Sequence, residues 1–361
     1  MSDMLDMIIE SSNRIFKDNC TKQLLDDAED GNFAIDLWNI IAESGLSSIA
    51  LPENKGGAGG DFIDAFNILK LAGKYGLPLP LAETLIAKWL GTELGFTFSN
   101  EPVTFSIQKD DNISFKMTGD GYSIAGEAKD VPWASAAKHI LLLGKSNEKD
   151  VIAFVPLDNA KIIKGKNLAA EPRDHVIFPN ILANGLSLRE VNCIDISEKS
   201  IHLLALAKSA MIAGAAEKVL ALSLFYANER QQFGRSLHRF QSIQQHIAVL
   251  TGETTACLTA ANSAIYALQG GRYEKEIPLA KMKLSESAGV IAMAAHQLHG
   301  AIGMTYEHML HHMTRRLWSW RDEAGNEAYW GKKLTKLIMK DKDSSLWEIL
   351  TNDKQFTKVE E

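Results

Sequence analysis

Hydrophobic spacing divides the chain into three regions. In residues 1–95 apolar side chains recur at helical intervals, as in FAIDLWNIIAESGL, where Phe33, Leu37 and Ile41 share one helix face. Gly45 follows the last turn of this pattern, where a glycine commonly ends a helix. We therefore expect an N-terminal all-α domain over residues 1–95.

Between residues 96 and 193 the pattern becomes strand-like. Short runs rich in β-branched and aromatic residues alternate with Asp, Asn, Gly and Pro at hairpin-like intervals. These runs are VTFSIQ, ISFKMTG, GYSIAG, HILLLG and VIAFVPL. The sequence predicts a middle β domain, a small barrel or sandwich, over residues 96–193.

The third region, residues 194–361, is helical again. Pro278 suits the first turn of a helix, and Gly270 with Gly271 would end the helix before it. Long Ala- and Leu-rich segments cover roughly residues 201–230, 241–269, 278–299 and 305–320. Segments of this length are typical of a bundle. The fold class predicted for the whole chain is α+β multidomain, ending in a C-terminal α-helical bundle.

Composition and charge narrow the range of functions. The formal charge is -7 and the basic residues are scattered, which argues against a nucleic-acid partner. Cys20, Cys193 and Cys257 lie far apart without CxxC spacing, which favours a reducing compartment and no thiolate metal site. The acidic start is unlike a signal peptide, and no run of about 18 uninterrupted apolar residues occurs. We expect a soluble, cytoplasmic protein with no membrane span.

Two motifs invite a ligand-binding interpretation that other features oppose. The glycines of GLSSIALPENKGGAGGD, residues 45–61, could admit a phosphate, but no GxGxxG or GxxxxGK[ST] pattern is present, so a tight connection between helices is preferred. His308, His311 and His312 have spacing that could gather zinc ligands. Because HExxH is absent and two arginines follow, we expect a partly exposed helix face without a metal.

Four further stretches together resemble the acyl-CoA dehydrogenase family, over nearly the whole chain. They are LWNIIAESGLSSIALPENKGGAGGD, GEAKDVPWASAAKHILLL, ERQQFGRSLHRFQSIQQ and QLHGAIGMTYEHMLHHMTRR. The resemblance implies the three-domain fold of that family. It also implies FAD as cofactor, an acyl-CoA substrate oxidised between its α and β carbons, and an electron-transferring flavoprotein as electron acceptor.

The resemblance assigns cofactor contacts to two separate segments. Arg230 and Phe233 would contact FAD, and Gln241 would hydrogen-bond it; a guanidinium suits two diphosphate oxygens. A second segment would receive the adenosine portion of FAD from a neighbouring subunit, which requires an oligomer. Its residues are Gln297, Gly300 and Ala301. The alternatives are a solvated helix end for Arg230 and an ordinary polar helix face for the glutamines.

The general base is the unresolved part of the resemblance. The family's base is a glutamate, and its two known positions fall here on Ala324 and Gln231, neither of which accepts a proton at neutral pH. The threonine expected two residues after the first position is Asn326, and the TEP..GS stretch that contacts the flavin ring is missing. The family arginine that helps to hold CoA or the base falls on Ala205, with Lys208 about one turn on.

Three hypotheses follow. The chain could be the subunit without a base in a heterotetramer of two kinds of subunit, resembling the enzymes that shorten steroid side chains. It could instead be a self-sufficient enzyme, for example a homo-oligomer, with a displaced carboxylate supplied by Glu323, Asp322 or Glu229. It could also be a binding or scaffold protein that kept the fold without turnover. For Arg321, Asp322 and Glu323 themselves a surface ion-pair cluster is the simplest interpretation, and for the tryptophans of LWSWRDEAGNEAYW it is packing.

Overall fold

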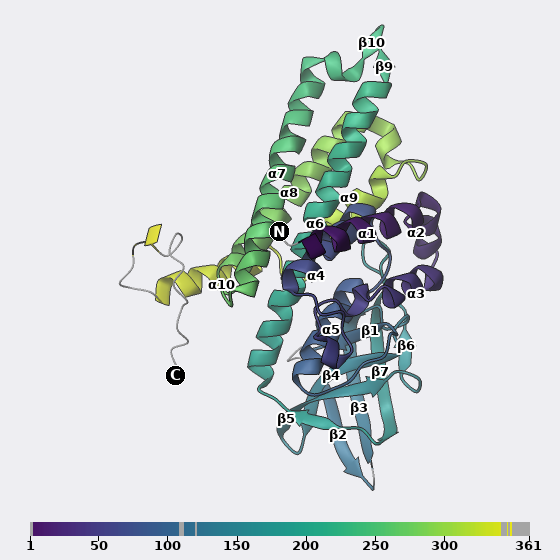
Figure 1. Cartoon of the computed structure of the whole chain (residues 1–361), viewed down its shortest axis with the longest axis vertical. Coiled ribbons are helices and arrows are strands. Elements are labelled where there is room, and N and C mark those ends of the chain that lie inside the picture. Colours follow the sequence, from purple (N-terminus) through teal and green to yellow (C-terminus); the bar gives the residue numbers. More distant parts are fainter. Residues whose placement is uncertain (1–2, 108–111, 120, 341–344, 346, 349–361) are drawn as a thin grey trace. The chain divides into compact units, whose positions relative to one another are not determined.

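The computed structural model describes residues 3–107, 112–119, 121–340, 345 and 347–348, and the chain forms two compact units (Figure 1). The first unit holds Met1–Leu69 and Leu77–Leu204, and the second holds Lys70–Gly76 and Ala205–Glu361. Each unit is described by itself below. The three domain boundaries expected from the sequence stay a prediction.

Helices open the first unit, as the hydrophobic spacing of residues 1–95 predicts. Leu25, Trp38 and Ile41 lie on their buried faces, and Thr21 caps the second helix by accepting a hydrogen bond from the Leu24 N–H at 3.2 Å. The elements are α1 (Asp3–Asn19), α2 (Lys22–Glu29), α3 (Ile35–Glu43), η1 (Leu46–Ser48), η2 (Glu53–Lys55), α4 (Phe62–Tyr75) and α5 (Leu81–Glu93).

The glycine-rich stretch between α3 and α4 is a tight connection, which confirms the preferred interpretation. Backbone N–H groups of the loop bind carbonyls of the same loop. Gly57 donates to the Pro52 carbonyl at 3.1 Å, and Gly59 donates to the Leu51 carbonyl at 3.0 Å. A Cβ on Gly57 would stand 2.0 Å from the Leu51 oxygen. Glycine is therefore required there by close packing of the loop on itself.

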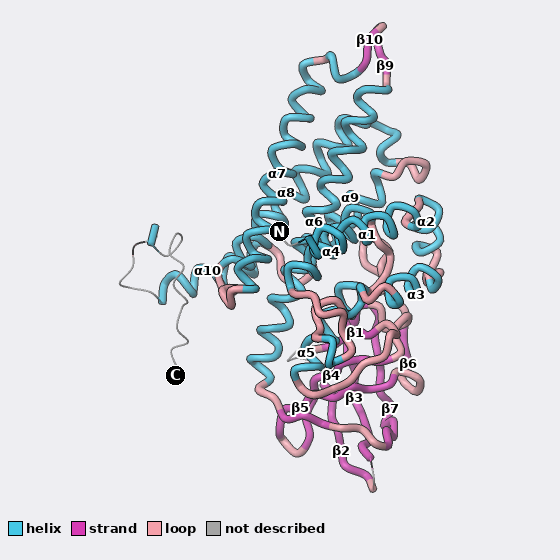
Figure 2. Tube along the Cα trace, viewed as in Figure 1, coloured by secondary structure: helices cyan, strands magenta, loops and turns pink. Residues whose placement is uncertain are grey.

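The β region forms one eight-stranded sheet in the order β6-β7-β3-β2-β4-β5-β8, with β1 pairing β4 in parallel (Figure 2). Side chains including Phe115, Ile124, Ile140 and Phe178 form its buried core. The strands are β1 (Val103–Ser106), β2 (Asn112–Thr118), β3 (Gly121–Pro132), β4 (His139–Ser146), β5 (Lys149–Pro156), β6 (Lys161–Ile163), β7 (Arg173–Asn184) and β8 (Leu188–Glu190). The sequence motifs correspond to β1 to β5.

The sequence pattern missed the last three strands, of which β7 is the longest. Its segment RDHVIFPNILAN contains Pro179, which argues against a central strand. The structure accommodates this proline at an irregularity in the pairing of β3 with β7, between Ile124 and Ala125, where Asn180 has a positive φ of 56°. A bulge tolerates a residue without a backbone donor, so the strand continues past it.

Helices make up most of the second unit. The elements are α6 (Cys193–Glu229), of which the second unit takes the part from Ala205, β9 (Gln231–Gln232), β10 (Arg235–Ser236), η3 (Leu237–Arg239), α7 (Gln241–Gln269), α8 (Glu276–His299), η4 (Gly300–Met304), α9 (Leu310–Asp322) and α10 (Glu327–Lys340). As predicted, α7 ends at Gly270 and Pro278 lies in the first turn of α8.

Two predicted helix starts were wrong. The pattern places one helix from about residue 201, but α6 begins at Cys193. It places another from about residue 305, but α9 begins at Leu310, and a 3₁₀ segment, η4, lies between α8 and α9. Gly300 ends α8 with φ 64° and ψ -145°, a conformation that is open almost only to glycine. The chain therefore changes direction before the histidines of α9 begin.

Glycines bring the last turn of α4 against α6 within the second unit. A Cβ on Gly73 would stand 2.1 Å from the Met211 carbonyl oxygen, and a Cβ on Gly214 would stand 1.8 Å from the Lys70 oxygen. The two backbones therefore touch where both helices carry glycine. This contact explains why residues Lys70–Gly76 belong to the second unit.

Within the described residues, α6 is long and apolar enough to cross a membrane when judged by length and composition alone. Of its most apolar stretch, 56% is buried in the structure. Core helices of water-soluble proteins meet the same two criteria, so the finding is weak evidence for a membrane span.

Candidate functional site

The motif RQQFGRS forms a short β-hairpin that joins α6 to α7. Gln232 pairs with Arg235 across the hairpin, and the two turn residues, Phe233 and Gly234, have positive φ angles of 51° and 76°. A two-residue turn with both φ angles positive matches the twist of the paired strands and favours glycine at its second position. The Leu237 N–H then closes the base of the hairpin by donating to the Arg230 carbonyl at 2.9 Å.

The turn holds an aromatic ring out of the protein. Phe233 is 91% exposed, and its ring forms a T-shaped pair with that of Phe240, with 6.2 Å between centroids. Phe240 makes a second contact, because the guanidinium of Arg235 lies over its ring, 4.1 Å from the centroid. A large apolar side chain fixed in water by a rigid turn indicates a surface that is covered when a ligand or partner binds.

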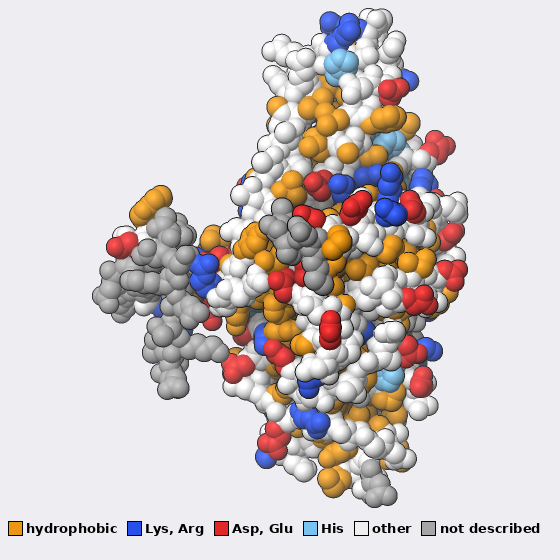
Figure 3. Space-filling view, in the orientation of Figure 1, with side chains coloured by type: hydrophobic (Ala, Val, Ile, Leu, Met, Phe, Trp, Pro, Cys, Tyr) orange, Lys and Arg blue, Asp and Glu red, His pale blue; other side chains and the backbone are white. Residues whose placement is uncertain are grey.

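Positive charge gathers around this ring. Arg230, Arg235 and Arg239 are exposed, and no carboxylate among the described residues forms an ion pair with them. Figure 3 shows basic side chains at the end of the bundle where Figure 1 labels β9 and β10. Guanidinium groups without a protein carboxylate can bind an anion, and a diphosphate offers two oxygens to each of them.

The start of α7 adds further donors beside the hairpin. Gln241 is the first residue of the helix and is exposed, and the side chain of the preceding Phe240 cannot cap the helix. The first backbone N–H groups of such a helix need partners from outside the helix. The Gln244 side chain instead donates to the His238 carbonyl at 3.1 Å, which fixes the short η3 segment.

The second cofactor segment predicted by the resemblance lies at the same end of the bundle. Tyr226, one turn before Arg230, stacks on His299 with centroids 4.6 Å apart. Gly300 follows His299 directly and Gln297 precedes it by two residues; Gln297, Gly300 and Ala301 are all exposed. No described heavy atom lies within 4 Å of the point where a Cβ on Gly300 would stand. The backbone here is open to close approach by a ligand.

These groups fit FAD chemically. The exposed arginines and the start of α7 suit a diphosphate, the Phe233 ring offers an apolar contact, and Gly300 leaves room for a flat group against the backbone. The residues that could hold the cofactor are Arg230, Phe233, Gln241, Gln297, Gly300 and Ala301.

The two family positions for a catalytic base contain no proton acceptor. Ala324 lies in the turn after α9 with a positive φ of 55°, followed by Gly325 at 86°. Its carbonyl accepts a hydrogen bond from Trp330 Nε1 at 2.8 Å, which fixes the turn against α10. Gln231 is an exposed amide on β9. Neither side chain can remove a proton from carbon at neutral pH.

The three candidate replacement carboxylates lie in different surroundings. Glu229 is the exposed last residue of α6. Asp322 is also exposed and accepts a hydrogen bond from Arg321 Nε at 3.3 Å. Glu323 is 20% exposed and lies 3.2 Å from the Nζ of Lys208, which is 2% exposed. The expected surface cluster therefore exists only for Arg321 and Asp322, because Glu323 turns toward a buried lysine.

A second buried lysine, which the sequence analysis missed, binds the end of α9. Lys281 on α8 donates to the carbonyls of Trp320 at 2.8 Å and Arg321 at 2.7 Å, and to Ser285 Oγ at 3.1 Å. Burial lowers the pKa of Lys281 to about 7, and the charge of Glu323 opposes this shift. The sequence signal was a lysine among Ala280, Leu284 and Ala288 on the apolar face of α8.

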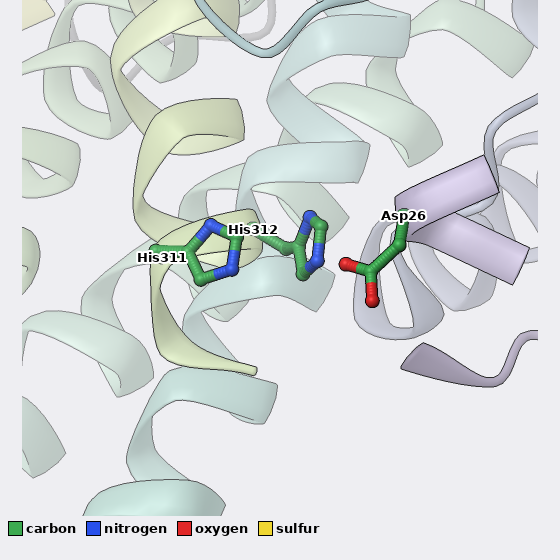
Figure 4. A group of neighbouring side chains, drawn as sticks. All are labelled: Asp26, His311 and His312. Carbon is green, nitrogen blue, oxygen red and sulfur yellow. The ribbon is translucent and has the colours of Figure 1, made fainter. Parts of the chain in front are cut away.

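The histidines differ from the expectation. His311 and His312 are buried, 6% and 0% exposed, with ring centroids 4.0 Å apart on α9 (Figure 4). The prediction of a partly exposed face was wrong for both, because both side chains lie on the buried side of α9. His308 lies before α9, where its Nδ1 accepts a hydrogen bond from the Leu310 N–H at 3.1 Å. Asp26, also drawn in Figure 4, is in the first unit and pairs with Lys22 at 2.6 Å.

The tryptophans of the last helices serve packing, as the sequence favours. Trp320 and Trp330 are fully buried. Trp318 stacks on His296 with centroids 5.6 Å apart. Ala205, which occupies the position of the family's arginine, is buried. Lys208, about one helical turn later, forms an ion pair with Glu323.

Comparison with known proteins gives the same family at both ends of the chain. The N-terminal domain of acyl-CoA dehydrogenases matches residues 2–98, and their C-terminal domain matches residues 194–329. The acyl-CoA dehydrogenase IpdE2 of Mycobacterium tuberculosis is 25% identical over 288 residues, 79% of this chain and 80% of the relative.

Two solved structures share the fold over almost the whole length. The ChsE4-ChsE5 complex of Mycobacterium tuberculosis has a TM-score of 0.81 at 17% identity, covering 94% of this chain and 98% of the other. A variant of the steroid acyl-CoA dehydrogenase Tcur3481-Tcur3483 has a TM-score of 0.81 at 23% identity, with the same coverage. The predicted fold class is confirmed. The chain belongs to the acyl-CoA dehydrogenase family and is an FAD-dependent flavoprotein of that family.

Proposed function

We propose that the chain is a subunit of a heteromeric acyl-CoA dehydrogenase that desaturates an acyl-CoA thioester between its α and β carbons, and that a partner subunit supplies the catalytic glutamate. One observation carries the proposal. Arg230 and Phe233 of the hairpin proposed to bind FAD are present and exposed, whereas Ala324 and Gln231 occupy the two positions at which the resemblance places the family's base.

The names of two structural relatives support the proposed assembly and substrate class. The ChsE4-ChsE5 structure is a complex of two named chains, and the Tcur3481-Tcur3483 enzyme is a steroid acyl-CoA dehydrogenase. A steroid side-chain thioester is therefore our proposed substrate class. A heterotetramer of two kinds of subunit is the proposed assembly, with an electron-transferring flavoprotein as electron acceptor in the cytoplasm.

Each part of the hairpin end has a proposed task. FAD, when bound, accepts the hydride equivalent from the β carbon. Arg230 binds the diphosphate, Phe233 covers an apolar part of the cofactor, and Gln241 donates a hydrogen bond at the start of α7. The segment of Gln297, Gly300 and Ala301 receives the adenosine portion of FAD from a neighbouring subunit. Sharing of one cofactor between subunits makes the oligomer part of the site.

A self-sufficient enzyme is the second candidate, and Glu323 is the observation that favours it. This carboxylate is one residue from the family's base position and is mostly enclosed. The ion pair with Lys208 opposes the idea, because a neighbouring ammonium group stabilises the carboxylate and makes it a weaker proton acceptor. A binding protein without turnover is the third candidate.

The test is anaerobic bleaching of the flavin absorbance by a panel of acyl-CoA thioesters that includes a steroid side-chain thioester. The chain is purified alone and also after co-expression with a second acyl-CoA dehydrogenase-like chain that carries a glutamate at either base position. We expect bleaching only with the partner, and loss of bleaching when the partner's glutamate becomes glutamine. Bleaching by the lone chain would contradict the heteromer and favour the self-sufficient enzyme. No bleaching in either preparation would favour the binding protein.

A further inference from the structure

Lys208 and Glu323 form an enclosed ion pair between α6 and the end of α9. The Nζ of Lys208 lies 3.2 Å from a Glu323 carboxylate oxygen, and the two side chains are 2% and 20% exposed. Burying an ammonium group is costly unless an opposite charge compensates it. Glu323 provides that charge, so each side chain holds the other in place.

The backbone of Glu323 is fixed from both sides. Its N–H donates to the Ser319 carbonyl at 3.2 Å at the end of α9. The next residue, Ala324, has a positive φ, and its carbonyl is bound by Trp330 Nε1. The turn therefore cannot easily rotate, and the ion pair with Lys208 is a contact that directs the Glu323 side chain toward α6.

A second cation acts on the same carboxylate. Lys281 is fully buried on α8, and Glu323 is the strongest of the charges that stabilise its ammonium form. Asp322 and Glu327 act on Lys281 in the same direction, and Lys208 acts against it. Glu323, which lies one residue from the family's base position, thus interacts with both buried lysines.

We propose that Glu323 is a latent general base and that Lys208 is the positioning residue that holds its carboxylate toward α6 and keeps it a poor proton acceptor. The inference rests on the proposed function, because it concerns the acyl-CoA thioester that this function requires. Without the Lys208 charge, the carboxylate would stand in surroundings of low polarity with a weaker partner. Its affinity for a proton would then rise.

The chemistry of a released Glu323 needs no oxidant. Its carboxylate takes the α proton of the thioester, the α C–H bond breaks, and the electron pair is delocalised onto the thioester oxygen as an enolate. In D₂O the resulting carboxylic acid exchanges its proton with solvent. It then returns a deuteron to the α carbon, so the substrate is recovered with deuterium and no electrons are transferred.

The experiment measures deuterium at the α carbon of a saturated acyl-CoA by mass spectrometry. It uses the full chain alone, and also the complex whose partner carries glutamine in place of its base. We expect background exchange in the wild type and in Lys208→Arg, which keeps the charge. Lys208→Met should raise the exchange rate by about tenfold or more. The double variant Lys208→Met/Glu323→Gln should return to background.

Lys283→Met is the matched control. Lys283 lies on the same helix as Lys281 and pairs with Glu253 at 3.0 Å, so its removal also breaks an ion pair of the second unit. It should leave exchange at background. Lys208→Gln, which removes the charge but keeps a hydrogen-bond donor, replaces Lys208→Met if the latter does not fold by circular dichroism.

The outcomes separate this inference from the proposed function. Background exchange in a folded, charge-free Lys208 variant, in both preparations, would overturn the latent base while leaving the heteromer intact. Exchange in the wild-type lone chain that disappears in Glu323→Gln would show Glu323 to be active already, against both proposals. The bleaching experiment on the wild-type complex tests the proposed function independently of either lysine variant.

Discussion

The rings of Tyr226 and His299 stack with centroids 4.6 Å apart and planes 21° apart, and this contact joins the two segments that carry the proposed cofactor residues. Tyr226 lies one turn before the hairpin, and His299 lies directly before Gly300. Burial lowers the pKa of His299 to about 4, so the ring is neutral at physiological pH and stacks without the cost of a buried charge.

Tyr226→Ala should therefore loosen both segments at once. The lost aromatic pair is worth about 0.5 to 1.5 kcal/mol beyond its buried area, so the helices should still form. We expect the dissociation constant of FAD, measured by fluorescence titration of the assembled enzyme, to rise by about tenfold. Tyr266→Ala, at an exposed tyrosine of α7, is the control. Equal FAD affinity in both variants would contradict a link between the segments.

Phe233→Ala separates ligand binding from stability. Because Phe233 is 91% exposed, its removal should change the free energy of unfolding by less than about 0.5 kcal/mol. The same change should weaken retention of FAD during gel filtration, because we propose that this ring covers an apolar part of the cofactor. Phe225→Ala on α6, at a phenylalanine that is 68% exposed, should retain FAD like the wild type. Unchanged retention in Phe233→Ala would remove this residue from the proposed cofactor site.

The sequence analysis named the residues of the hairpin but did not predict the hairpin itself. Local rules could have done so, because the FG pair favours a two-residue turn with two positive φ angles. The ion pair of Glu323 is formed with Lys208, which lies more than a hundred residues earlier in the chain. No local periodicity relates these two positions, so the sequence could offer Glu323 as a carboxylate but not its partner.

The strands and the histidines show a second limit of local patterns. The strand β7 carries charged residues and Pro179, so its sequence lacks the alternation that indicates a strand, and pairing with β3 decides its conformation. The burial of His311 and His312 likewise depends on tertiary packing around α9, which the local spacing of histidines does not reveal. Element type was predictable where hydrophobic spacing was strong, and boundaries were not.

Gly73→Ala tests the backbone contact between α4 and α6. The added methyl group would stand 2.1 Å from the Met211 oxygen, so the helices must separate. We expect a loss of about 1 to 3 kcal/mol in the free energy of unfolding, as for an overpacked core. Gly252→Ala is the control on α7, where no described atom lies within 4 Å of the new methyl group. That variant should be neutral or more stable by up to about 1 kcal/mol, because alanine favours the helix. Equal urea midpoints for the two variants would contradict the close contact.

Lys281 should leave a signature in the pH dependence of stability. Its pKa is about 7 in the folded chain, against 10.5 ordinarily. Between these values the unfolded chain binds the proton more tightly, so the contribution of Lys281 to folding stability rises with pH from about 7 to 10.5. Below pH 7 both states are protonated, and the penalty for burying the charge is present in full.

In Lys281→Met this dependence disappears, while other titrating groups remain. The free energy of unfolding of the wild type minus that of Lys281→Met should therefore increase from pH 7 to pH 9, when both are measured by urea unfolding. The Met variant also leaves the Trp320 and Arg321 carbonyls without the hydrogen bonds that Lys281 donates. This loss lowers its stability at every pH but adds no slope. A difference that stays constant between pH 7 and pH 9 would show that Lys281 keeps an ordinary pKa in the folded chain.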